Sequence, residues 1–317
     1  MRSYLTYYNI AMATTAVVIP TYNRCSTLLL ALSKVFEFLP ADHHVIVADS
    51  GSSDGTADAV KKNFPQAHLL QGTSSMWWAA AINRGIEKAK ELGCLYVLTY
   101  NDDNVATSGL FTNLARAAES APNAIIAATC CYLDRPEVVF FAGRMRARGT
   151  DRVYYLDHDT LLTALGKGIR TVDMLHGMCT LFPMAVFHKV GLFNEKAFPQ
   201  VLADDDLLMR ANRAGFSLQV ALDAVVLNDR TKTGNNPYDQ RLGPSGIVQL
   251  LVSRKSNFQI AARTKFLWRY RRNSYFFCKT WLFDYLRLFT IIVTRWLLPF
   301  KAFHRLGIQW GQRLQRR

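Results

Sequence analysis

Two adjacent carboxylates, Asp102 and Asp103, lie just beyond the apolar run Leu95–Tyr100. Neighbouring carboxylates repel each other unless a cation or solvent compensates their charge. Oxygen ligands of this kind suit Mg²⁺ or Mn²⁺ bridging a diphosphate, because phosphate oxygens can complete the coordination shell. A solvated turn, with one Asp capping the following helix, explains the pair equally well when it is taken alone.

A single carboxylate, Asp49, ends a second apolar run and precedes a Gly/Ser turn that also contains Asp54. A carboxylate at this place can accept a hydrogen bond from the imide N–H of a nucleobase, which would select uracil or thymine. Asp and Ser also favour turns, and ordinary turn chemistry is the simpler interpretation of this segment in isolation.

Three consecutive acids, Asp204, Asp205 and Asp206, stand near the start of a helical pattern. The helix dipole favours acids in a first turn, so two of the three could be structural. Three consecutive acids are more than the start of a helix needs for capping. One carboxylate directed at a site could act as general base and remove the proton of an acceptor hydroxyl.

The predicted helix Trp77–Leu92 carries further candidates. Arg84, beside Asn83, could face a diphosphate, since guanidinium recognises phosphate well. A solvated surface Arg is equally compatible with the sequence. Trp77 and Trp78 belong to the core or form a platform on which a sugar stacks, and the core is the safer interpretation for at least one of them.

His176 and Gly177 precede a further apolar run, Met178–Pro183. A histidine near a cleft can titrate or contact substrate. A hydrogen-bonded structural histidine is the commoner case, and we keep both interpretations.

Strands and helices that alternate along residues 14–130 must position these side chains. Strands are predicted at Ala16–Pro20, Val45–Asp49, Ala67–Leu70, Leu95–Tyr100 and Ile125–Thr129, and helices at Ser26–Phe38 (capped by Ser26), Thr56–Asn63, Trp77–Leu92 and Gly109–Ser120. Such repeats imply βαβ units and a mostly parallel sheet flanked by helices. Ligands bind beyond the carboxyl ends of such strands. Three polar clusters, Thr21–Arg24, Asp49–Gly51 and Asn101–Asp103, should therefore meet at one edge.

The pattern is less regular after residue 130. We expect strands at Val138–Ala142, Met178–Pro183 and Leu218–Leu227, a helix at Pro199–Ala214, a charged loop at Arg144–Arg152 and a boundary loop at Thr231–Gly246. The α/β catalytic domain is therefore predicted to span residues 1–232, and residues 233–317 form a helical tail.

The net charge of +14 is confined to the last fifth of the chain. Residues 254–317 hold fifteen Lys and Arg but only one acid, Asp284, and the rest of the chain is neutral. A hydrophobic content of 50% excludes wholesale disorder. The six cysteines form no C-x2-C pair, which argues against zinc and indicates buried thiols in a reducing cytosol.

The tail interleaves these basic residues with aromatic and aliphatic ones, as a helix lying in a membrane interface does. The segment nearest to a membrane span, Leu286–Phe300, contains Arg287 and Arg295, and Met1–Met12 lacks the apolar run of a signal peptide. We therefore expect a cytoplasmic protein, peripheral on the inner face of the cell membrane and bound to its anionic surface. Nucleic-acid binding is the rival, disfavoured by the aliphatic content. Packing of the tail on the catalytic domain, or on a second copy in a homo-oligomer, is a third possibility.

Taken in order, four segments resemble family 2 glycosyltransferases of the GT-A (Rossmann-like) fold. They are Val17–Arg24 (VVIPTYNR), Val47–Thr56 (VADSGSSDGT), Asn101–Asp103 and Asp204–Arg210. The similarity covers about residues 14–230, and the second segment is quite specific. It implies an inverting transferase that uses a nucleotide-sugar donor.

The resemblance also implies roles for single residues. Asp49 would bind the donor base, Asp103 would be the main ligand of Mg²⁺ or Mn²⁺ together with Asp102, and Asp204 would be the catalytic base. The implied nucleotide-sugar site comprises Pro20, Thr21, Tyr22, Arg24, Asp49, Ser50, Gly51, Asp54, Trp78, Asn83, Arg84 and Asp102, and the acceptor side comprises His176, Gly177 and Asp205.

Three departures from the family pattern bear on the metal and the base. Asn101 holds the first position of the D-x-D motif, and no His stands near Asn228, where many relatives place a metal ligand. Ala203 replaces the usual Glu before Asp204. Which of the three acids is the base therefore stays open at this point.

The function expected is transfer of a sugar from a UDP- or dTDP-sugar to a hydroxyl of a lipid-linked saccharide, in O-antigen, capsule or other surface-polysaccharide synthesis. A sugar-nucleotide nucleotidyltransferase is an alternative, but the glycine-rich basic signature of such enzymes is missing from Thr21–Thr27. A non-catalytic membrane or nucleic-acid binder gives no reason for three acidic clusters.

Overall fold

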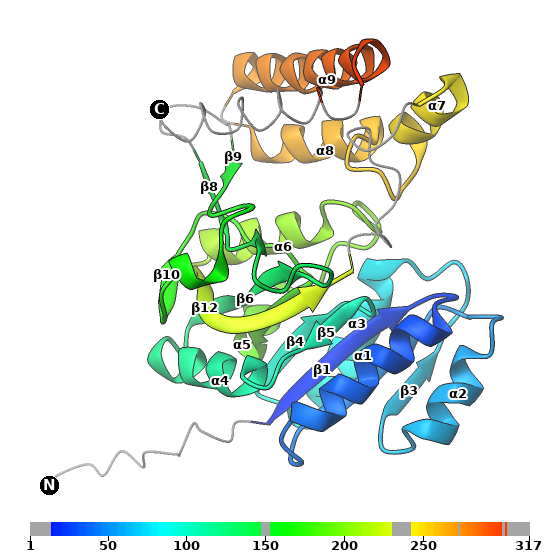
Figure 1. Cartoon of the computed structure of the whole chain (residues 1–317), viewed down its shortest axis with the longest axis vertical. Helices are drawn as coiled ribbons and strands as arrows, with labels where there is room; N and C mark the ends of the chain where they lie inside the picture. The colour runs from blue at the N-terminus through cyan, green and yellow to red at the C-terminus, as the bar shows by residue number, and fades with distance from the viewer. Residues whose placement is uncertain (1–13, 147–152, 230–241, 272, 300–301, 303–317) are drawn as a thin grey trace, which may run out of the picture.

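The computed structural model describes residues 14–146, 153–229, 242–271, 273–299 and 302, and shows a central sheet flanked by helices (Figure 1). Its first half is parallel, in the strand order β4-β1-β2-β3. The strands are β1 (Thr15–Thr21), β2 (His44–Asp49), β3 (His68–Gln71) and β4 (Tyr96–Tyr100), connected through α1 (Cys25–Phe38), α2 (Thr56–Asn63) and α3 (Trp78–Glu91). The predicted elements of this half are confirmed to within two residues at each end.

The second half of the sheet is mixed. β11 (Cys179–Pro183) runs antiparallel between β4 and β6 (Ala124–Tyr132), and β12 (Ser217–Asn228) then pairs parallel with β6. Short strands β5 (Asn104–Ala106), β7 (Val139–Phe141) and β10 (Ile169–Thr171) extend it, and β8 (Arg144–Arg146) pairs with β9 (Val153–Tyr155) outside it. The remaining elements of this half are α4 (Leu110–Ser120), η2 (Leu162–Ala164), α5 (Met184–Val190) and α6 (Ala203–Arg213).

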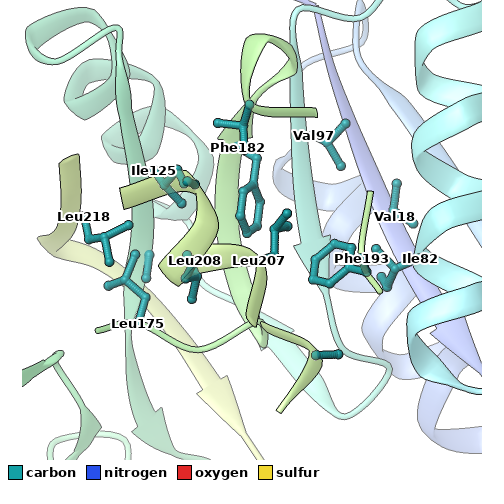
Figure 2. Packing of buried hydrophobic residues seen from close by; sticks show 14 of the residues in the cluster. Val18, Ile82, Val97, Ile125, Leu175, Phe182, Phe193, Leu207, Leu208 and Leu218 are labelled. Carbon is teal, nitrogen blue, oxygen red and sulfur yellow. The ribbon is translucent and has the colours of Figure 1, made fainter. Parts of the chain in front are cut away.

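The core lies on both faces of the sheet because side chains alternate along each buried strand. On β1, Ala16 and Val18 join the cluster under α3 and α6, and Val17 and Ile19 join the cluster under α1 and α4. Figure 2 shows the first of these clusters, in which Phe182 of β11 packs among apolar side chains of the sheet and of α6. Burial on both faces explains the continuous apolar runs of β1 and β2.

The prediction that Ser26 caps the first helix is wrong. The N-cap position of α1 is Arg24, whose side chain makes no capping bond. A carboxylate from another turn takes this role, since Asp54 Oδ2 accepts from the backbone N–H of Cys25 at 2.9 Å. Asp54 Oδ1 also accepts from Thr56 Oγ1, at the start of α2. One carboxylate thus satisfies the first turns of two helices, which spacing in the sequence does not reveal.

Three boundaries of the second half also differ from the prediction. Arg144–Arg146, predicted as part of a loop, forms β8 because it pairs with β9. The helix predicted from Pro199 begins at Ala203, after Leu202 in the left-handed region with φ 63°. The loop predicted to extend to Gly246 ends earlier, because α7 (Pro244–Val252) begins with Pro at its first turn.

The basic tail is helical, as predicted, and part of it belongs to the core. It comprises α7, α8 (Ile260–Tyr270) and α9 (Ser274–Leu297), gathered at one end of the molecule (Figure 1). Ala262 and Phe266 of α8 are buried in the main hydrophobic cluster, where the ring of Phe266 lies 5.9 Å from that of Phe198. Packing of the tail on the catalytic domain, which the sequence left open as a third possibility, is therefore observed for α8.

The outer helix α9 is held to α7 and α8. Leu288 packs with Leu250 of α7, and Asp284 forms an ion pair with Arg263 of α8 at 2.6 Å. No helix in the described part of the chain is long and apolar enough to cross a membrane. The predictions for Met1–Met12 and for the boundary near residue 232 fall outside the described residues, as does the end of the tail.

Candidate active site

The carboxyl ends of the parallel strands meet at one edge, as the sequence predicts. Thr21, at the end of β1, is paired in register with Asp49, at the end of β2. The backbone N–H of Ser50 donates to Thr21 O at 2.9 Å, and that of Gly72 donates to Asp49 O at 2.8 Å. The polar residues that follow β1, β2 and β3 are therefore connected by backbone hydrogen bonds. Pro20 lies buried within β1, opposite Ala48 of β2.

The two carboxylate oxygens of Asp49, at this edge, differ in their hydrogen bonding. Its Oδ1 accepts from the backbone N–H and from the hydroxyl of Ser52. Its Oδ2 is buried and has no hydrogen-bond partner among the described residues, and the side chain is 1% exposed. An unsatisfied buried carboxylate oxygen is costly, and a ligand N–H would remove that cost. Gly51 is required beside it, because its φ is +77° and an added Cβ would lie 3.1 Å from the backbone of residues 72–74.

Asp102 and Asp103 lie together beyond β4 and share one guanidinium. Arg24 Nη1 donates to Asp102 Oδ1 at 2.6 Å and to Asp103 Oδ2 at 3.2 Å. Thr21 Oγ1 donates to Asp102 Oδ2 at 2.9 Å, and Asn228 Nδ2 donates to Asp103 Oδ1 at 3.0 Å. Burial, opposed by Arg24, raises the pKa of both carboxyl groups. Their shared charge is thus only partly compensated.

These two carboxylates suit a hard divalent cation. They are adjacent, both lie under 9% exposed, and they carry two negative charges against the single positive charge of Arg24. Within the described residues no group of three or more His, Cys, Asp and Glu gathers as a metal site. A cation held by Asp102 and Asp103 would therefore complete its shell with other oxygens, such as those of a diphosphate. Asn228, which holds Asp103, occupies the region where the sequence lacks a His.

A cavity of about 220 Å³ opens beside this pair. Asp102 and Asp103 line it together with Asp229 and with the first turns of α1, at Ser26 and Thr27. The backbone N–H of Asp229 donates to Asp103 O at 3.1 Å, which brings the end of β12 to the same place. The carboxylates therefore border an open space that is large enough for a phosphate group.

The three consecutive acids of α6 have different partners. Asp204 Oδ2 accepts from the backbone N–H of Gly177 at 2.9 Å, and its Oδ1 accepts from the N–H of Asp205 at 3.0 Å. Asp205 Oδ1 forms an ion pair with Arg144 Nη2 at 2.6 Å. Asp206 is fully buried and is bound by the side chains of Arg210 and Tyr270. Among the described residues, Asp204 alone of the three has no cation within ion-pair distance, which leaves it the most available as a proton acceptor.

The surroundings of Asp204 raise its pKa, which suits a proton acceptor. Burial, followed by the charge of Asp205, raises the pKa of Asp204 to about 6, and Arg144 works against this rise. A carboxylate with a pKa near 6 is mostly ionised at neutral pH and is a stronger base than an ordinary Asp. The neighbouring glycine is required, since an added Cβ on Gly177 would lie 2.9 Å from Trp78 Cη2 and 3.2 Å from Asp204 Cβ.

Trp78 connects the two halves of the site. Its indole Nε1–H donates to Asn101 Oδ1 at 3.3 Å, next to the paired carboxylates. The far edge of the same ring packs against Gly177, next to Asp204. The indole ring therefore extends from Asn101, beside the carboxylate pair, to Gly177, beside Asp204, and a sugar stacked on it would lie between the two.

Some predicted residues lie apart from this centre. Asn83 is buried and holds the loop after α5, since its amide donates to Phe193 O and to Glu195 Oε2. Asp54 caps α1 and α2, as described above. By contrast, two other predicted residues stay at the edge beside Asp49. Arg84 Nη1 donates to the carbonyl oxygen of Gln71, which is paired with Asp49, and Tyr22 directly follows Thr21 and is 44% exposed.

His176 lies next to Gly177, but its imidazole contacts protein. Nδ1 accepts from the N–H of Met178, Nε2 lies 3.6 Å from Cys130 Sγ, and the ring packs on Phe141. Burial and the charge of Arg144 lower the pKa of His176 to about 3. The imidazole is therefore neutral at physiological pH, and the structural interpretation of this residue is the better one.

Arg144, Tyr270 and Asn228 each bind one of the clustered acids, a role that the sequence did not predict for any of them. Arg144 lies in a segment that was predicted to be a charged loop, and Tyr270 lies in the tail. No local pattern marks them, because each reaches its carboxylate across the fold rather than along the chain.

Comparison with known proteins agrees with this geometry. The model of the family described as "Glycosyl transferase family 2" matches residues 16–190. The chain is 27% identical over 212 residues to N-acetylglucosaminyl-diphospho-decaprenol L-rhamnosyltransferase of Mycobacterium tuberculosis, which covers 61% of this chain and 69% of that protein.

Solved structures show the same fold at low identity. A mannosyltransferase of Pyrobaculum calidifontis, in complex with GDP-Man and Mn²⁺, is 17% identical with a TM-score of 0.53 over 94% of this chain and 80% of its own. TarS of S. aureus, residues 1–349, is 15% identical with a TM-score of 0.50. That match covers 68% of this chain and 60% of the TarS chain, so this chain spans less than two thirds of that structure.

The matched region contains β1, β2, β4 and β11, and with them Asp49, the carboxylate pair and Gly177. The chain belongs to glycosyl transferase family 2 and has the GT-A fold.

Proposed function

We propose that this chain is an inverting glycosyltransferase that moves a sugar from a UDP- or dTDP-sugar to a hydroxyl of a lipid-linked glycan, in the synthesis of a cell-surface polysaccharide. The observation that carries the proposal is Asp204. Its carboxylate has a raised pKa and is held by the backbone of Gly177. Trp78 packs beside Gly177, and its indole N–H donates to Asn101, next to the carboxylate pair on the donor side. This arrangement supports a donor site at the carboxylate pair and a base at Asp204, with the transferred sugar between them.

The donor base belongs at the end of β2. The free, buried Oδ2 of Asp49 can accept the imide N–H that uracil and thymine share. Cytosine has no such N–H, so the same oxygen disfavours it. The diphosphate would then extend from Asp49 toward Asp102 and Asp103, past Arg24, whose guanidinium lies between the two carboxylates.

Asp204 performs the proton step. It accepts the proton of the acceptor hydroxyl as the hydroxyl oxygen attacks the anomeric carbon, from the face opposite the departing nucleoside diphosphate. One displacement of this kind inverts the configuration at that carbon. A Mg²⁺ or Mn²⁺ ion held by Asp103 and Asp102 would offset the negative charge on the leaving diphosphate. Arg24 contributes a fixed positive charge to the same side of the site.

The lipid-linked acceptor is supported by the relative from Mycobacterium tuberculosis, whose name specifies a diphospho-decaprenol acceptor. A direct test incubates the full-length chain and Mn²⁺ with UDP- and dTDP-sugars and with N-acetylglucosaminyl-diphospho-lipid, and determines the anomeric configuration of the product. An inverted linkage is expected. A retained configuration, or neither transfer nor hydrolysis of any donor, would refute the proposal.

Replacing Asp49 by Ala should weaken donor binding by about tenfold to a hundredfold, because one charge-assisted hydrogen bond to the base is lost. Calorimetry with UDP and with CDP measures this change in binding affinity. Ser52→Ala is the matched control, since it removes a partner of Oδ1 and leaves Oδ2 in place. Equal UDP affinity in wild type and in Asp49→Ala would place the base elsewhere.

The tail presents an apolar face to solvent, and we propose that it lies on the inner face of the cell membrane. Leu282, Leu286 and Phe289 follow helical spacing along α9, and each is at least half exposed. Two apolar residues of α7, Val248 and Val252, are also exposed by more than half. An exposed apolar stripe on a strongly basic segment suits an anionic bilayer surface.

Deleting residues 254–317 would not test this membrane role cleanly, since Phe266 and Tyr270 pack against the catalytic domain. The double variant Leu286→Ser/Phe289→Ser is expected to lose most of its flotation with phosphatidylglycerol vesicles. The control Leu95→Ser/Leu161→Ser removes apolar side chains of similar exposure outside the tail and should float as wild type does. Full flotation of the α9 variant would show that this face is not the anchor.

A further inference from the structure

A second cavity, of about 330 Å³, lies where the catalytic domain meets the tail. Ser75 and Trp77 line it from the start of α3, Lys196 and Pro199 from the segment before α6, and Arg254 and Lys265 from the tail. None of these residues has a part in the catalytic roles described so far. The cavity is therefore separate from the carboxylate pair and needs its own explanation.

Its charge is positive and poorly compensated. Three cations, Lys196, Arg254 and Lys265, line it against one carboxylate, Glu195. Glu195 is itself engaged, since its Oε2 accepts from Asn83 Nδ2 at 2.9 Å. In the part of the chain that the structure describes, no carboxylate lies within ion-pair distance of the three cations. Cations that converge on one cavity without acidic partners favour an anionic ligand.

The indole ring of Trp77 adds an aromatic surface to this cavity. The guanidinium carbon of Arg254 lies 5.3 Å from the centre of the Trp77 ring. A cation–π contact of this kind orients the guanidinium and limits its motion. The cavity thus combines a positioned Arg, two Lys and an indole surface, a combination that suits a phosphate group attached to an apolar chain.

The walls of the cavity belong to the same segments as the residues around the proposed base. Trp77 lines the cavity, and the next residue, Trp78, packs against Gly177 beside Asp204. The segment on the other wall is fixed to the same helix start, since the N–H of Ala79 donates to Pro199 O at 3.0 Å. That segment leads directly into α6, which carries Asp204. A ligand in the cavity would therefore lie against the start of α3 and the segment before α6, the two segments that also hold Trp78 and Asp204.

The opposite wall belongs to the tail. Arg254 and Lys265 belong to the tail, and the outer helix of the tail, α9, exposes apolar side chains. A molecule with its lipid at the apolar face of α9 and its sugar at Asp204 would extend across the junction of the tail and the catalytic domain. The diphosphate of such a molecule lies between its lipid and its sugar, and the cavity lies at this junction.

We propose that this cavity binds the diphosphate that joins the acceptor sugar to its lipid, with Arg254 and Lys265 as its principal ligands. The inference rests on the proposed function, because it takes the acceptor to be lipid-linked. A sugar-diphospho-lipid carries two negative charges, which match the net charge of +2 on the charged residues that line the cavity.

Binding of farnesyl diphosphate tests the site without turnover. Calorimetry on the full-length chain, with UDP and Mn²⁺ saturating the donor site, compares wild type with Arg254→Gln/Lys265→Gln. The variant should bind at least about tenfold more weakly, because two charge-assisted contacts are lost. The control Lys255→Gln/Lys279→Gln removes the same charge from the tail outside the cavity lining and should bind within about twofold of wild type.

The outcomes distinguish an acceptor diphosphate from a bilayer headgroup as the ligand. They also distinguish failure of this inference from failure of the proposed function. Wild-type affinity in the cavity variant would overturn the inference. If that variant kept its affinity for farnesyl diphosphate but lost flotation with phosphatidylglycerol vesicles, the cavity would bind a bilayer headgroup, which also overturns it. Failure of the proposed function would appear differently, as wild-type protein that transfers no sugar whatever its affinity for farnesyl diphosphate.

Discussion

Replacing Asp204 by Asn is expected to lower kcat for sugar transfer by about 10²–10⁴-fold while the affinity for the nucleotide donor changes little. Asn has nearly the same shape and can still accept from the backbone N–H of Gly177. It cannot take a proton from the acceptor hydroxyl. The loss should therefore appear in kcat with the donor Kd preserved, which single-turnover transfer assays and calorimetry measure separately.

The pH dependence gives an independent view of the same group. The active form of a base is the deprotonated one, so kcat of the wild type should rise with pH through about 6 and level off above it. Arg144 lowers the pKa of Asp204, so Arg144→Gln should move this rise to higher pH. The residual activity of Asp204→Asn should lack the inflection.

The neighbouring acids provide matched controls. Asp205→Asn removes a negative charge that raises the pKa of Asp204, so its inflection should move to lower pH. Asp206→Asn disturbs the contacts with Arg210 and Tyr270, and its main effect should be a lower melting temperature with the inflection in place. Transfer by Asp204→Asn at the wild-type rate would show that another group is the base.

The choice among the three acids also shows where prediction from the sequence ends. Strand periodicity placed Asp49, Asp102 and Asp103 at one edge because neighbouring parallel strands end together. Nothing local separates Asp204 from the next two acids. The distinction comes from Arg144 and Tyr270, which lie 61 and 64 positions away from the carboxylates that they bind. Contacts of that separation depend on tertiary packing, which periodicity does not encode.

The tail illustrates the same limit. Its composition indicated amphipathic helices, and the helices are present. The pattern did not show that Phe266 would join the main core, because an apolar residue on an amphipathic helix can face a bilayer or a protein equally well. Burial divides the two cases, since Phe266 is 8% exposed and Phe289 of α9 is 65% exposed. The inner helix α8 therefore packs on the catalytic domain, whereas the outer helix α9 exposes apolar side chains to solvent.

The second large effect is expected at the carboxylate pair, where Asp103→Ala should abolish the cation dependence of donor binding. In the wild type, Asp102 and Asp103 carry two buried negative charges against one guanidinium, a surplus that favours Mg²⁺ or Mn²⁺. Without Asp103, Arg24 pairs with Asp102 alone and the surplus disappears. A cation contributes several kcal/mol to such a leaving group, so kcat/KM in Mn²⁺ should fall by about 10²–10³-fold.

Asp102→Asn is the informative comparison, because the oxygens of Asp102 accept from Thr21 Oγ1 and from Arg24. Asp102→Asn should weaken UDP binding both with Mn²⁺ and in a chelator, because the substitution releases Thr21 and Arg24 from their positions. Asp103→Ala should instead bind UDP in chelator about as the wild type does and gain nothing when Mn²⁺ is added. Calorimetry under the two conditions separates these patterns. If Mn²⁺ strengthened UDP binding equally in wild type and in Asp103→Ala, the cation would have to be held by other oxygens, and Asp229, on the wall of the same cavity, would be the next residue to replace.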